Sequence, residues 1–435
     1  MRSSSIIDPA DLNPYGQNIL MDHLKIRTPA EMLELMTVIP QLPKLVESIP
    51  WHIRLHWVMF IRKLYLPPIQ AEPVATTADL MLRQGYSYRN PAEPRTWAQL
   101  AGYRTLTKLK AAPATAAVLT GDSGTGKTEL LDQSFGLYPQ VIEHESYPGI
   151  IGSHKQVVYL SVNVPAGGRS HDLARALGIQ WDLVTQGTRF ARFIDLKNPK
   201  GEQMLDEWTL IARAHALGIL HLDEVQNLFH IPPVKERKKI RAPGQPGPIL
   251  HISDDETLKW LLTFMNIWSI PLFFSGTPDG IGALTNRLST MSRISTMGYF
   301  STERFDSIDP KSYFRRIFFK QLLKLQFVKD PVPLEDIDKL ARLVIDRTAG
   351  IQRLIIALWI AAHRVAFDRA RASRSKVDNL LIQDFDNAAN TYLKLLQPCV
   401  KALLSNTPDA RSRYEDLVPR DDDFWALFWN RIETL

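Results

Sequence analysis

A glycine-rich segment in the first third of the chain has the residue types and spacing of a phosphate-binding loop. Residues 121–128 read GDSGTGKT, which fits the pattern GxxxxGK(S/T). In such a loop the backbone N–H groups surround phosphate oxygens, the lysine reaches the β and γ oxygens, and the last hydroxyl can bind Mg²⁺. The sequence therefore predicts a nucleoside triphosphate site formed by Gly121, Asp122, Ser123, Gly124, Thr125, Gly126, Lys127 and Thr128.

The context of this segment favours a nucleotide site over a glycine-rich turn that carries a surface lysine. An apolar run at 116–120, which predicts a strand, ends directly before it, and a helical pattern begins at Glu129. A strand, a loop and a helix in this order place the positive end of the helix dipole at the phosphates. We expect the ligand to be ATP with Mg²⁺.

Two adjacent carboxylates end a second apolar run. Residues 219–222 predict a buried strand, and Asp223 and Glu224 follow it directly. The carboxyl ends of parallel strands meet at one edge of a sheet, where the phosphate-binding loop also lies. We expect Asp223 to bind Mg²⁺ together with Thr128, and Glu224 to polarise the attacking water. The alternative is a strand that ends in a solvated acidic turn. We interpret His221, inside the strand, as a core residue.

A third apolar run ends in small polar residues. Residues 271–274 lead into Ser275, Gly276, Thr277 and Pro278. A polar side chain at this strand end, beside the acid pair, could contact the γ-phosphate. Thr277 is the first candidate and Ser275 the second, and the alternative is a turn hydroxyl without a role in nucleotide binding.

Elements that could position these residues follow from the alternation of short apolar runs with helical patterns. The strand candidates are 116–120, 157–164, 219–222, 271–275 and 297–301. Short buried strands separated by helices predict an α/β fold, in which a five-stranded parallel sheet is covered by helices on both faces. Outside this region the patterns are helical only. We therefore divide the chain into a mainly helical N-terminal extension that binds partners (1–100), an α/β core (101–302), an α-helical domain (303–396) and a C-terminal tail (397–435).

Composition excludes several classes of protein. Of the 435 residues, 45% are hydrophobic and 23% are charged, which is typical of folded chains and excludes global disorder. The single cysteine, Cys399, cannot form an internal disulfide. We find no signal peptide or membrane-spanning pattern and expect a cytoplasmic protein without a membrane partner. The net charge of +6 permits a polyanionic partner without requiring one.

Taken together, these motifs resemble those of AAA+ ATPases. The order is GDSGTGKT, then LHLDE at 220–224, then a strand ending in SGTP, then an all-helical domain. The resemblance implies that the helical domain is a lid over the nucleotide, and that an arginine near the start of a lid helix contacts the phosphates. Arg353, in the segment TAGIQR at 348–353, fits this position. The alternative for Arg353 is a solvated helix arginine.

Four strings resemble the TnsC group of AAA+ transposition regulators, which includes TniB and MuB. They are MLRQGYSYRNP at 81–91, LYPQVIEH at 137–144, ARAHALGILHLDEVQNL at 212–228 and FMNIWSIPLFFSGTP at 264–278. The likeness covers about residues 50–300, and beyond Arg304 it is one of fold only. YPQV and AHALG are not general AAA+ features, and they therefore discriminate within the superfamily.

The resemblance implies a function. Proteins of this group bind ATP, assemble as rings or helical spirals around duplex DNA, and act as slow, switch-like ATPases. They connect a target selector of the TnsD or TniQ type to transposase subunits of the TnsA and TnsB type. We would then expect a bacterial protein associated with the nucleoid. In such assemblies an arginine of one subunit reaches the γ-phosphate bound by its neighbour. Arg287 and Arg293 are the candidates here, and Arg293 is preferred because it lies nearest the last strand.

Two segments could contact DNA phosphates in such an assembly. Arg169 and Ser170 begin a helical pattern that also contains Arg175, and a basic run between prolines contains Lys235, Arg237, Lys238 and Lys239. Phosphate contacts of this kind give affinity that is largely independent of sequence. A solvated loop is the alternative for each segment. Near the C-terminus, Phe424, Trp425, Phe428 and Trp429 predict an aromatic helix face that docks on a partner or packs on the lid.

Two other functions compete with a transposition regulator. A replication initiator or helicase loader would share the fold, but the forty or so residues after Leu396 are short for an added DNA-binding domain. A nucleotide-gated scaffold without significant hydrolysis would also share the loop, although the presence of Lys127, Asp223 and Glu224 weighs against it.

Overall fold

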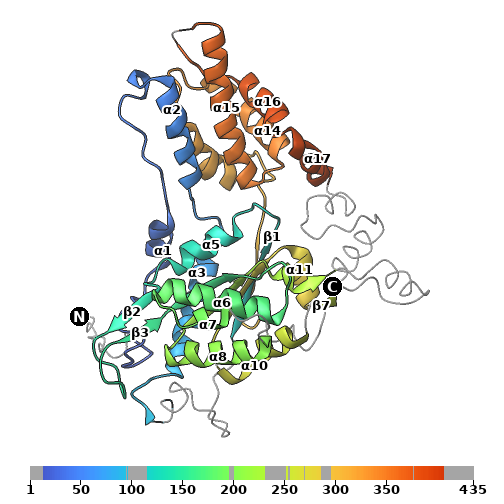
Figure 1. Ribbon diagram of the computed structural model, residues 1–435. Coiled ribbons are helices and arrows are strands. Elements are labelled where there is room, and N and C mark those ends of the chain that lie inside the picture. Colours follow the sequence, from blue (N-terminus) through green and yellow to red (C-terminus); the bar gives the residue numbers. More distant parts are fainter. Residues whose placement is uncertain are drawn as a thin grey trace, which may run out of the picture.

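A five-stranded parallel sheet forms the centre of the lower lobe of the protein in Figure 1. The structure is a computed structural model that describes residues 13–94, 96, 115–194, 200–230, 251–252, 255–268, 270–285, 295–375 and 377–405. The strand order is β4-β5-β8-β1-β9, and every neighbouring pair is parallel. The strands are β4 (Tyr159–Asn163), β5 (Ile219–Asp223), β8 (Leu272–Gly276), β1 (Ala116–Gly121) and β9 (Tyr299–Thr302).

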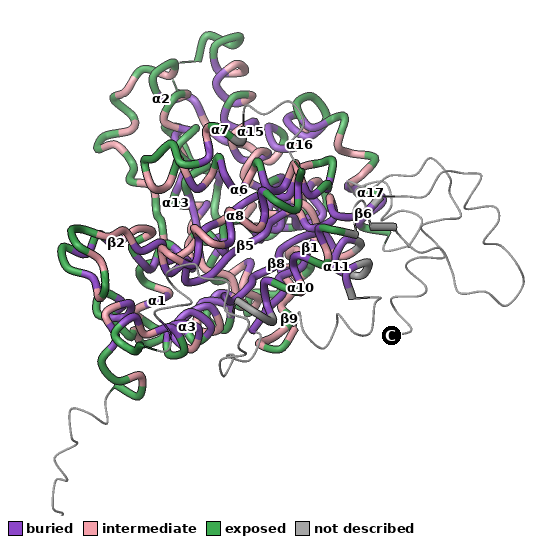
Figure 2. The backbone as a smooth tube through the Cα atoms, turned by 60° about the horizontal axis from the view of Figure 1, so that its bottom comes forward, coloured by how far each residue is buried: buried purple, intermediate pink, exposed green. Residues whose placement is uncertain are grey.

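The three central strands are buried on both faces because helices cover each face of the sheet. Every residue of β1, β5 and β8 is buried, and Figure 2 shows these strands deep inside the lobe. One face packs on α6 (Ser170–Thr185), α8 (Gly201–Ala214), α10 (Asp255–Trp268) and α11 (Pro278–Thr285). The other face packs on α1 (Pro29–Met36), α3 (Ala71–Ser87) and α5 (Lys127–Phe135). The near-continuous apolar strands predicted from the sequence are what such a covered parallel sheet requires.

The expected five-stranded parallel sheet is confirmed, although one strand differs from its prediction. The run 157–164 is divided: Val157 ends β3 (His154–Val157), which pairs with β2 (Val141–His144) in a separate antiparallel sheet, and only β4 enters the main sheet. The division falls at Val158, whose N–H donates to Gln140 O at 2.8 Å. A second small sheet pairs β6 (Phe229–His230) with β7 (His251–Ile252).

The N-terminal part of the chain is divided between two hydrophobic cores. Helices α1 and α3 pack on the sheet, whereas α2 (Trp51–Val58) and the following 3₁₀ helix η3 (Met59–Lys63) pack on the upper lobe. Figure 1 shows α2 beside the long helix of that lobe. Helix α1 ends at Met36, and Thr37 has an extended backbone conformation.

The strings 81–91, 137–144 and 212–228 meet at the edge of the sheet where β5 begins. The Tyr86 hydroxyl donates to Ala216 O at 3.0 Å, and Arg89 Nη2 donates to Gly218 O at 3.2 Å. The Tyr138 hydroxyl donates to Asp79 Oδ1 at 2.6 Å. These contacts attach α3 to the core. Tyr86, Arg89 and Tyr138 of these strings therefore have a structural role here.

Helices alone form the upper lobe, which we call the lid. Its elements are η5 (Phe314–Phe319, a π-helix), α13 (Lys320–Lys324), α14 (Ile337–Thr348), α15 (Gln352–Ala372), α16 (Ile382–Thr391) and α17 (Gln397–Ser405). Apolar residues of α2, η5, α14, α15 and α16 share one core, while Val400 and Leu403 of α17 pack on Ile351 and Leu354. The helical regions before and after the core are thus as predicted. None of the described helices is both long and apolar enough to cross a membrane.

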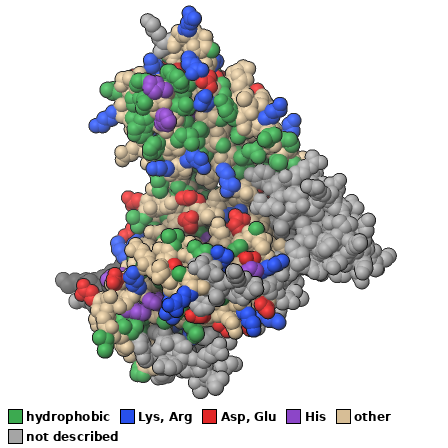
Figure 3. Space-filling view, in the orientation of Figure 1, with side chains coloured by type: hydrophobic (Ala, Val, Ile, Leu, Met, Phe, Trp, Pro, Cys, Tyr) green, Lys and Arg blue, Asp and Glu red, His purple; other side chains and the backbone are tan. Residues whose placement is uncertain are grey.

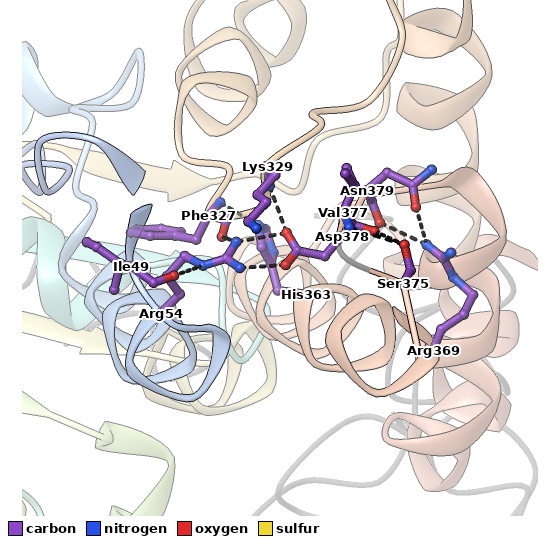
Figure 4. A network of polar contacts seen from close by, with 10 residues as sticks. All are labelled: Ile49, Arg54, Phe327, Lys329, His363, Arg369, Ser375, Val377, Asp378 and Asn379. Carbon is purple, nitrogen blue, oxygen red and sulfur yellow. Dashed lines mark hydrogen bonds and ion pairs between the residues drawn. The ribbon is translucent and has the colours of Figure 1, made fainter. Parts of the chain in front are cut away.

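A buried ion pair attaches α2 to the lid. Arg54 is 1% exposed, and its two terminal nitrogens donate to Asp378 Oδ1 and Oδ2 at 2.8 and 2.5 Å. Arg54 Nη1 also donates to Phe327 O at 2.7 Å, and Lys329 N–H donates to Asp378 Oδ1 at 2.8 Å (Figure 4). A charge pair taken out of water persists when its remaining hydrogen-bonding groups are satisfied, as they are here. The contact joins positions 324 residues apart in the sequence.

Candidate nucleotide-binding site

The loop between β1 and α5 has the geometry of a phosphate site. Lys127 is the first residue of α5, and its Nζ lies over the loop, where it donates to Gly121 O at 2.7 Å and Asp122 O at 3.1 Å. The Thr125 hydroxyl lies 2.7 Å from that of Thr302 on β9, which ties the loop to the next strand of the sheet. The loop is therefore held in place from both sides, with its ammonium group facing the loop interior.

Thr128 and Asp223 meet although they are 95 residues apart. The Thr128 hydroxyl donates to Asp223 Oδ2 at 2.6 Å. The parallel register explains this contact, because the loop after β1 and the carboxyl end of β5 lie at the same edge of the sheet. A hydroxyl and a carboxylate are hard oxygen ligands of the kind that Mg²⁺ prefers. The predicted pair is thus assembled at the phosphate loop.

Asp223 ends a chain of hydrogen bonds that crosses three strands. Ser275 Oγ donates to Asp223 Oδ1, His221 Nε2 lies 2.7 Å from Ser275 Oγ, and His221 Nδ1 lies 3.0 Å from Ser161 Oγ. An ionised carboxylate can only accept, so Ser275 donates to it and accepts from His221 Nε2–H. His221 Nδ1 then accepts from Ser161. Ser275, the second candidate for a γ-phosphate contact, is fully buried and its hydroxyl donates to Asp223, which favours Thr277 as the candidate.

Burial and hydrogen bonding set the charge states along this chain. Burial lowers the pKa of His221 to about 4, so the imidazole is neutral at physiological pH. Burial alone would raise the pKa of Asp223, but contacts with His221, Ser275, Thr128 and the Glu224 N–H outweigh burial and hold the pKa below its ordinary value. Asp223 is thus an anion at neutral pH, as a metal-binding carboxylate must be.

Glu224 lies next to Asp223 in a left-handed backbone conformation, with φ 57° and ψ 41°. This conformation is uncommon outside glycine and often marks functional positions. Its N–H donates to Asp223 Oδ1 at 2.9 Å, and its carboxylate Oε2 accepts from Gln226 Nε2. The backbone turn thus separates the two adjacent acids: Asp223 faces Thr128, and Glu224 faces Gln226.

Thr277 lies just after β8, beside Glu224 and the loop. Its side chain is 3% exposed and its N–H donates to Gln226 Oε1 at 3.2 Å. Its hydroxyl has no hydrogen-bond partner among the described residues, and Thr277 lines the same cavity as Lys127 and Glu224. A buried hydroxyl without a partner costs free energy, which a ligand oxygen would recover.

The lid contacts the phosphate loop through the first turn of α15. Arg353 N–H donates to Gly124 O at 3.1 Å. Gly124 has φ +85°, and a Cβ there would lie 3.0 Å from Ile351 Cγ2 and 3.2 Å from Arg353 Cβ. Gly126 has φ +95°, and a Cβ there would lie 3.1 Å from Gln352 Oε1. These two glycines therefore permit both the loop conformation and the close approach of the lid. The Arg353 side chain is exposed and lines the cavity.

One large cavity connects the phosphate loop with the lid. Its volume is about 1190 Å³. Its lining includes Lys127, Thr128, Glu224, Thr277 and Arg353, and both apolar and basic residues of η3 and α15, among them Met59, Lys63, Ile356 and Arg364. In Figure 3, basic side chains lie along the side of the lid that faces the lower lobe. A cavity with both charged and apolar lining residues suits a nucleotide, which carries charged phosphates and an apolar base.

Tyr65 contributes a second buried hydroxyl to this cavity. The residue is 4% exposed, and its hydroxyl has no hydrogen-bond partner among the described residues. Burial, together with the charge of Glu129, raises its pKa above the ordinary value, so the phenol stays protonated. Thr277 and Tyr65 are thus both cavity-lining residues whose buried hydroxyls have no hydrogen-bond partner among the described residues, and the residues that line the cavity fit a bound nucleotide with Mg²⁺ at Thr128 and Asp223.

The predicted DNA-contact and neighbour-contact residues are on the surface or outside the described part of the chain, except for Ser170, which is buried. Arg169 and Arg175 are exposed at the start of α6. Ser170 is 5% exposed and its hydroxyl donates to Glu256 Oε2 at 3.3 Å, so a DNA contact of this residue would use its backbone N–H rather than its hydroxyl. The residues that lie outside the described ranges are Lys235, Arg237, Lys238, Lys239, Arg287, Arg293 and the aromatic residues Phe424, Trp425, Phe428 and Trp429.

Sequence reasoning did not identify Gln226, Gln352 or Tyr65 as site residues. Gln226 directly follows DEV in the sequence, so its nearness to the acid pair was a usable signal. Gln352 precedes the predicted Arg353 and could have been found in the same way. Tyr65 gave no signal, because it reaches the cavity from the N-terminal segment, more than fifty residues before the loop.

Residues 111–284 match the family model described as "AAA domain". The chain contains an AAA domain with the AAA+ fold. This domain holds the phosphate loop, the acid pair and Thr277, and Arg353 follows it in the lid. No curated protein matches the chain.

Solved structures with similarity to this AAA domain protein are distant in sequence. The Aeropyrum pernix ORC2 protein in its ADP form is 13% identical with a TM-score of 0.40, over 86% of this chain and 89% of that chain. The same protein with ADPNP and ADP is 14% identical with a TM-score of 0.38, over 85% and 87%. The FIGL-1 AAA domain is 14% identical with a TM-score of 0.33, over 72% and 79%.

Proposed function

We propose that this protein is an ATP-hydrolysing switch whose AAA domain binds ATP and Mg²⁺ between the phosphate loop and the lid. The observation that carries the proposal is the Thr128–Asp223 hydrogen bond of 2.6 Å, beside Lys127 and the unpartnered Thr277 hydroxyl. Few other ligands need a metal-binding pair, a buried ammonium group and a glycine loop in one place.

Each side chain of the site has a role that follows from its position. Lys127 would exchange its loop carbonyls for phosphate oxygens, and the Thr277 hydroxyl would donate to the terminal phosphate. Thr128 and Asp223 would hold Mg²⁺, which supplies charge neutralisation at the phosphate oxygens. Glu224 would orient and polarise the attacking water as the general base.

The position of the lid would depend on which nucleotide occupies the site. Gln352 and Arg353 begin the lid helix α15 and lie against the glycine loop, so a change at the phosphates is transmitted to the lid without an intermediate element. Helix α2 would move with the lid because the Arg54–Asp378 pair binds it there. ATP and ADP would then favour different lid positions, which is what a switch requires.

We further propose that the switch regulates DNA transposition. The four strings that resemble the TnsC group support this role. The protein would oligomerise on duplex DNA, as a ring or helical spiral at the bacterial nucleoid, and link a TnsD- or TniQ-like selector to TnsA- and TnsB-like transposase subunits. Arg169 and Arg175 are exposed and available to phosphates, and the segment with Lys235, Arg237, Lys238 and Lys239 is the second candidate. Arg293 or Arg287 would act on the neighbouring subunit's nucleotide.

Electron microscopy of the purified chain with linear duplex DNA tests both parts of this proposal. We expect rings or filaments on DNA with ATP or a slowly hydrolysed analogue, and none without nucleotide. An equal amount of assembly in all three conditions would contradict the nucleotide switch. ATP hydrolysis without any assembly on DNA would agree with the proposed ATPase activity and contradict the proposed role in transposition.

A further inference from the structure

Gln226 lies between the two residues that would act on the terminal phosphate. It belongs to the 3₁₀ helix η4 (Val225–Leu228), directly after the acid pair, and is 1% exposed. Its Nε2 donates to Glu224 Oε2, and its Oε1 accepts from the Thr277 N–H at 3.2 Å. One side chain thus joins the candidate general base, directly after β5, to the residue that follows β8.

The two contacts determine the orientation of the amide. A backbone N–H can only donate, so the Gln226 atom that faces Thr277 must be the oxygen. The nitrogen then faces Glu224, whose ionised carboxylate can only accept. The reversed amide would place an N–H against an N–H on one side and oxygen against oxygen on the other. The bridge therefore has a single arrangement.

Two glycines form the space that Gln226 occupies. A Cβ on Gly280, in α11, would lie 2.5 Å from the Cα and the Cβ of Gln226. A Cβ on Gly276 would lie 2.9 Å from Gln226 Oε1 and 2.7 Å from Val225 Cγ2. Neither glycine has a positive φ, so close packing rather than backbone conformation explains these positions.

We propose that Gln226 is a positioning residue that holds Glu224 in register with Thr277, and so couples the general base to the γ-phosphate contact. This inference rests on the proposed ATPase function. Because the glutamate side chain is flexible, the Glu224 carboxylate takes one orientation only when a neighbouring group holds it. Gln226 supplies that attachment, and it anchors the carboxylate to the strand end that faces the phosphate.

The variant Gln226→Glu tests the coupling with the least disturbance. It keeps an oxygen for the Thr277 N–H and replaces the donor to Glu224 with a second carboxylate. We expect kcat for ATP hydrolysis to fall about ten-fold or more, because a displaced catalytic group loses orientation, while the Kd for ATP stays within about three-fold. Gly280→Ala, which leaves Gln226 intact but fills its space, should lower kcat in the same way.

A double-mutant cycle separates positioning from a general structural effect. In a Glu224→Gln background, Gln226→Glu should cause no further loss of kcat, because Gln226 acts through Glu224. The control is Asn227→Leu, which removes the adjacent amide and its 2.7 Å bond to Val164 O, and should leave kcat unchanged.

The outcomes distinguish this inference from the proposed function. If the wild-type chain hydrolyses ATP and kcat is equal or higher in Gln226→Glu and Gly280→Ala, the positioning role of Gln226 is contradicted. The proposed ATPase function is then unaffected. An additive loss in the cycle would also overturn it. A folded wild-type chain that does not hydrolyse ATP would overturn the proposed function itself.

Discussion

The backbone N–H of Arg353 donates a hydrogen bond of 3.1 Å to the carbonyl of Gly124. The first two residues of the lid helix are thus in direct contact with the glycine loop. The contact survives substitution of the Arg353 side chain, because it uses only backbone atoms. The guanidinium group itself is exposed at the cavity and is available to phosphate oxygens.

Arg353→Ala should therefore weaken ATP binding without unfolding the protein. The loss of a charge-assisted hydrogen bond to phosphate predicts an increase of about ten-fold in the Kd for ATP, measured by calorimetric titration. The control is Arg342→Ala, which removes an exposed arginine of α14 and should leave the Kd unchanged. Equal Kd values in the wild type and Arg353→Ala would remove Arg353 from the nucleotide site.

Glu224→Gln should separate ATP binding from hydrolysis. The amide keeps the size of the side chain but cannot accept the proton of the attacking water, so kcat should fall by on the order of 10² or more while ATP remains bound. Steady-state phosphate release measures this effect, with Glu202→Gln, an exposed acid in the first turn of α8, as the control. Unchanged turnover in Glu224→Gln would assign the role of base to another residue.

Tyr65→Phe should weaken nucleotide binding without lowering the stability of the free protein. We expect the nucleotide to give the Tyr65 hydroxyl its missing partner, so its removal should raise the Kd for both ATP and ADP about five-fold. Tyr147→Phe is a matched control, because the Tyr147 hydroxyl is also buried without a hydrogen-bond partner among the described residues but Tyr147 does not line the cavity. The same Kd change in both variants, or in neither, would contradict a nucleotide contact of Tyr65.

Arg54→Met should destabilise the lid. The substitution leaves Asp378 buried without its charge partner, which predicts a loss of about 3–5 kcal/mol in the free energy of unfolding, measured with a chemical denaturant. Arg364→Met breaks the exposed pair with Asp368 and should cost less than about 1 kcal/mol. Similar losses in the two variants would contradict the structural role of the buried pair.

The same contact has a predictable pH dependence. Burial raises the pKa of Asp378, but the hydrogen bonds from Arg54 and the Lys329 N–H outweigh burial and hold the pKa below its ordinary value. A carboxyl with a lowered pKa contributes stability above its unfolded pKa of about 4, and this contribution is lost as the pH falls further. The stability difference between wild type and Arg54→Met should therefore be full at neutral pH and shrink in acid.

The sequence predicts the parts of the site that depend on local patterns. The loop at 121–128, the acids at the end of β5 and Thr277 after β8 each follow an apolar run, and parallel strands place their carboxyl ends at one edge. The lid helices follow from their helical periodicity. Such features depend on neighbours in the sequence, and they could therefore be predicted before the structure was known.

Contacts between distant segments could not be predicted in this way. The attachment of α2 to the lid depends on Arg54 and Asp378, 324 residues apart. The choice between Ser275 and Thr277 depends on which hydroxyl faces Asp223, and the bridge through Gln226 depends on two strand ends that meet only in the folded sheet. The burial of Ser170 depends on Glu256, 86 residues away. None of these relationships leaves a periodic signal.

The central claim is that a triphosphate binds where Lys127 lies over the glycine loop. Calorimetric titration of ATP with Mg²⁺ into the full chain, beside a Lys127→Ala variant shown to be folded by circular dichroism, tests it most directly. We predict binding by the wild type and a loss of affinity of at least about ten-fold in Lys127→Ala, because a charged donor to phosphate is removed. A folded wild-type chain that binds no ATP, or equal affinity in both proteins, would contradict the account.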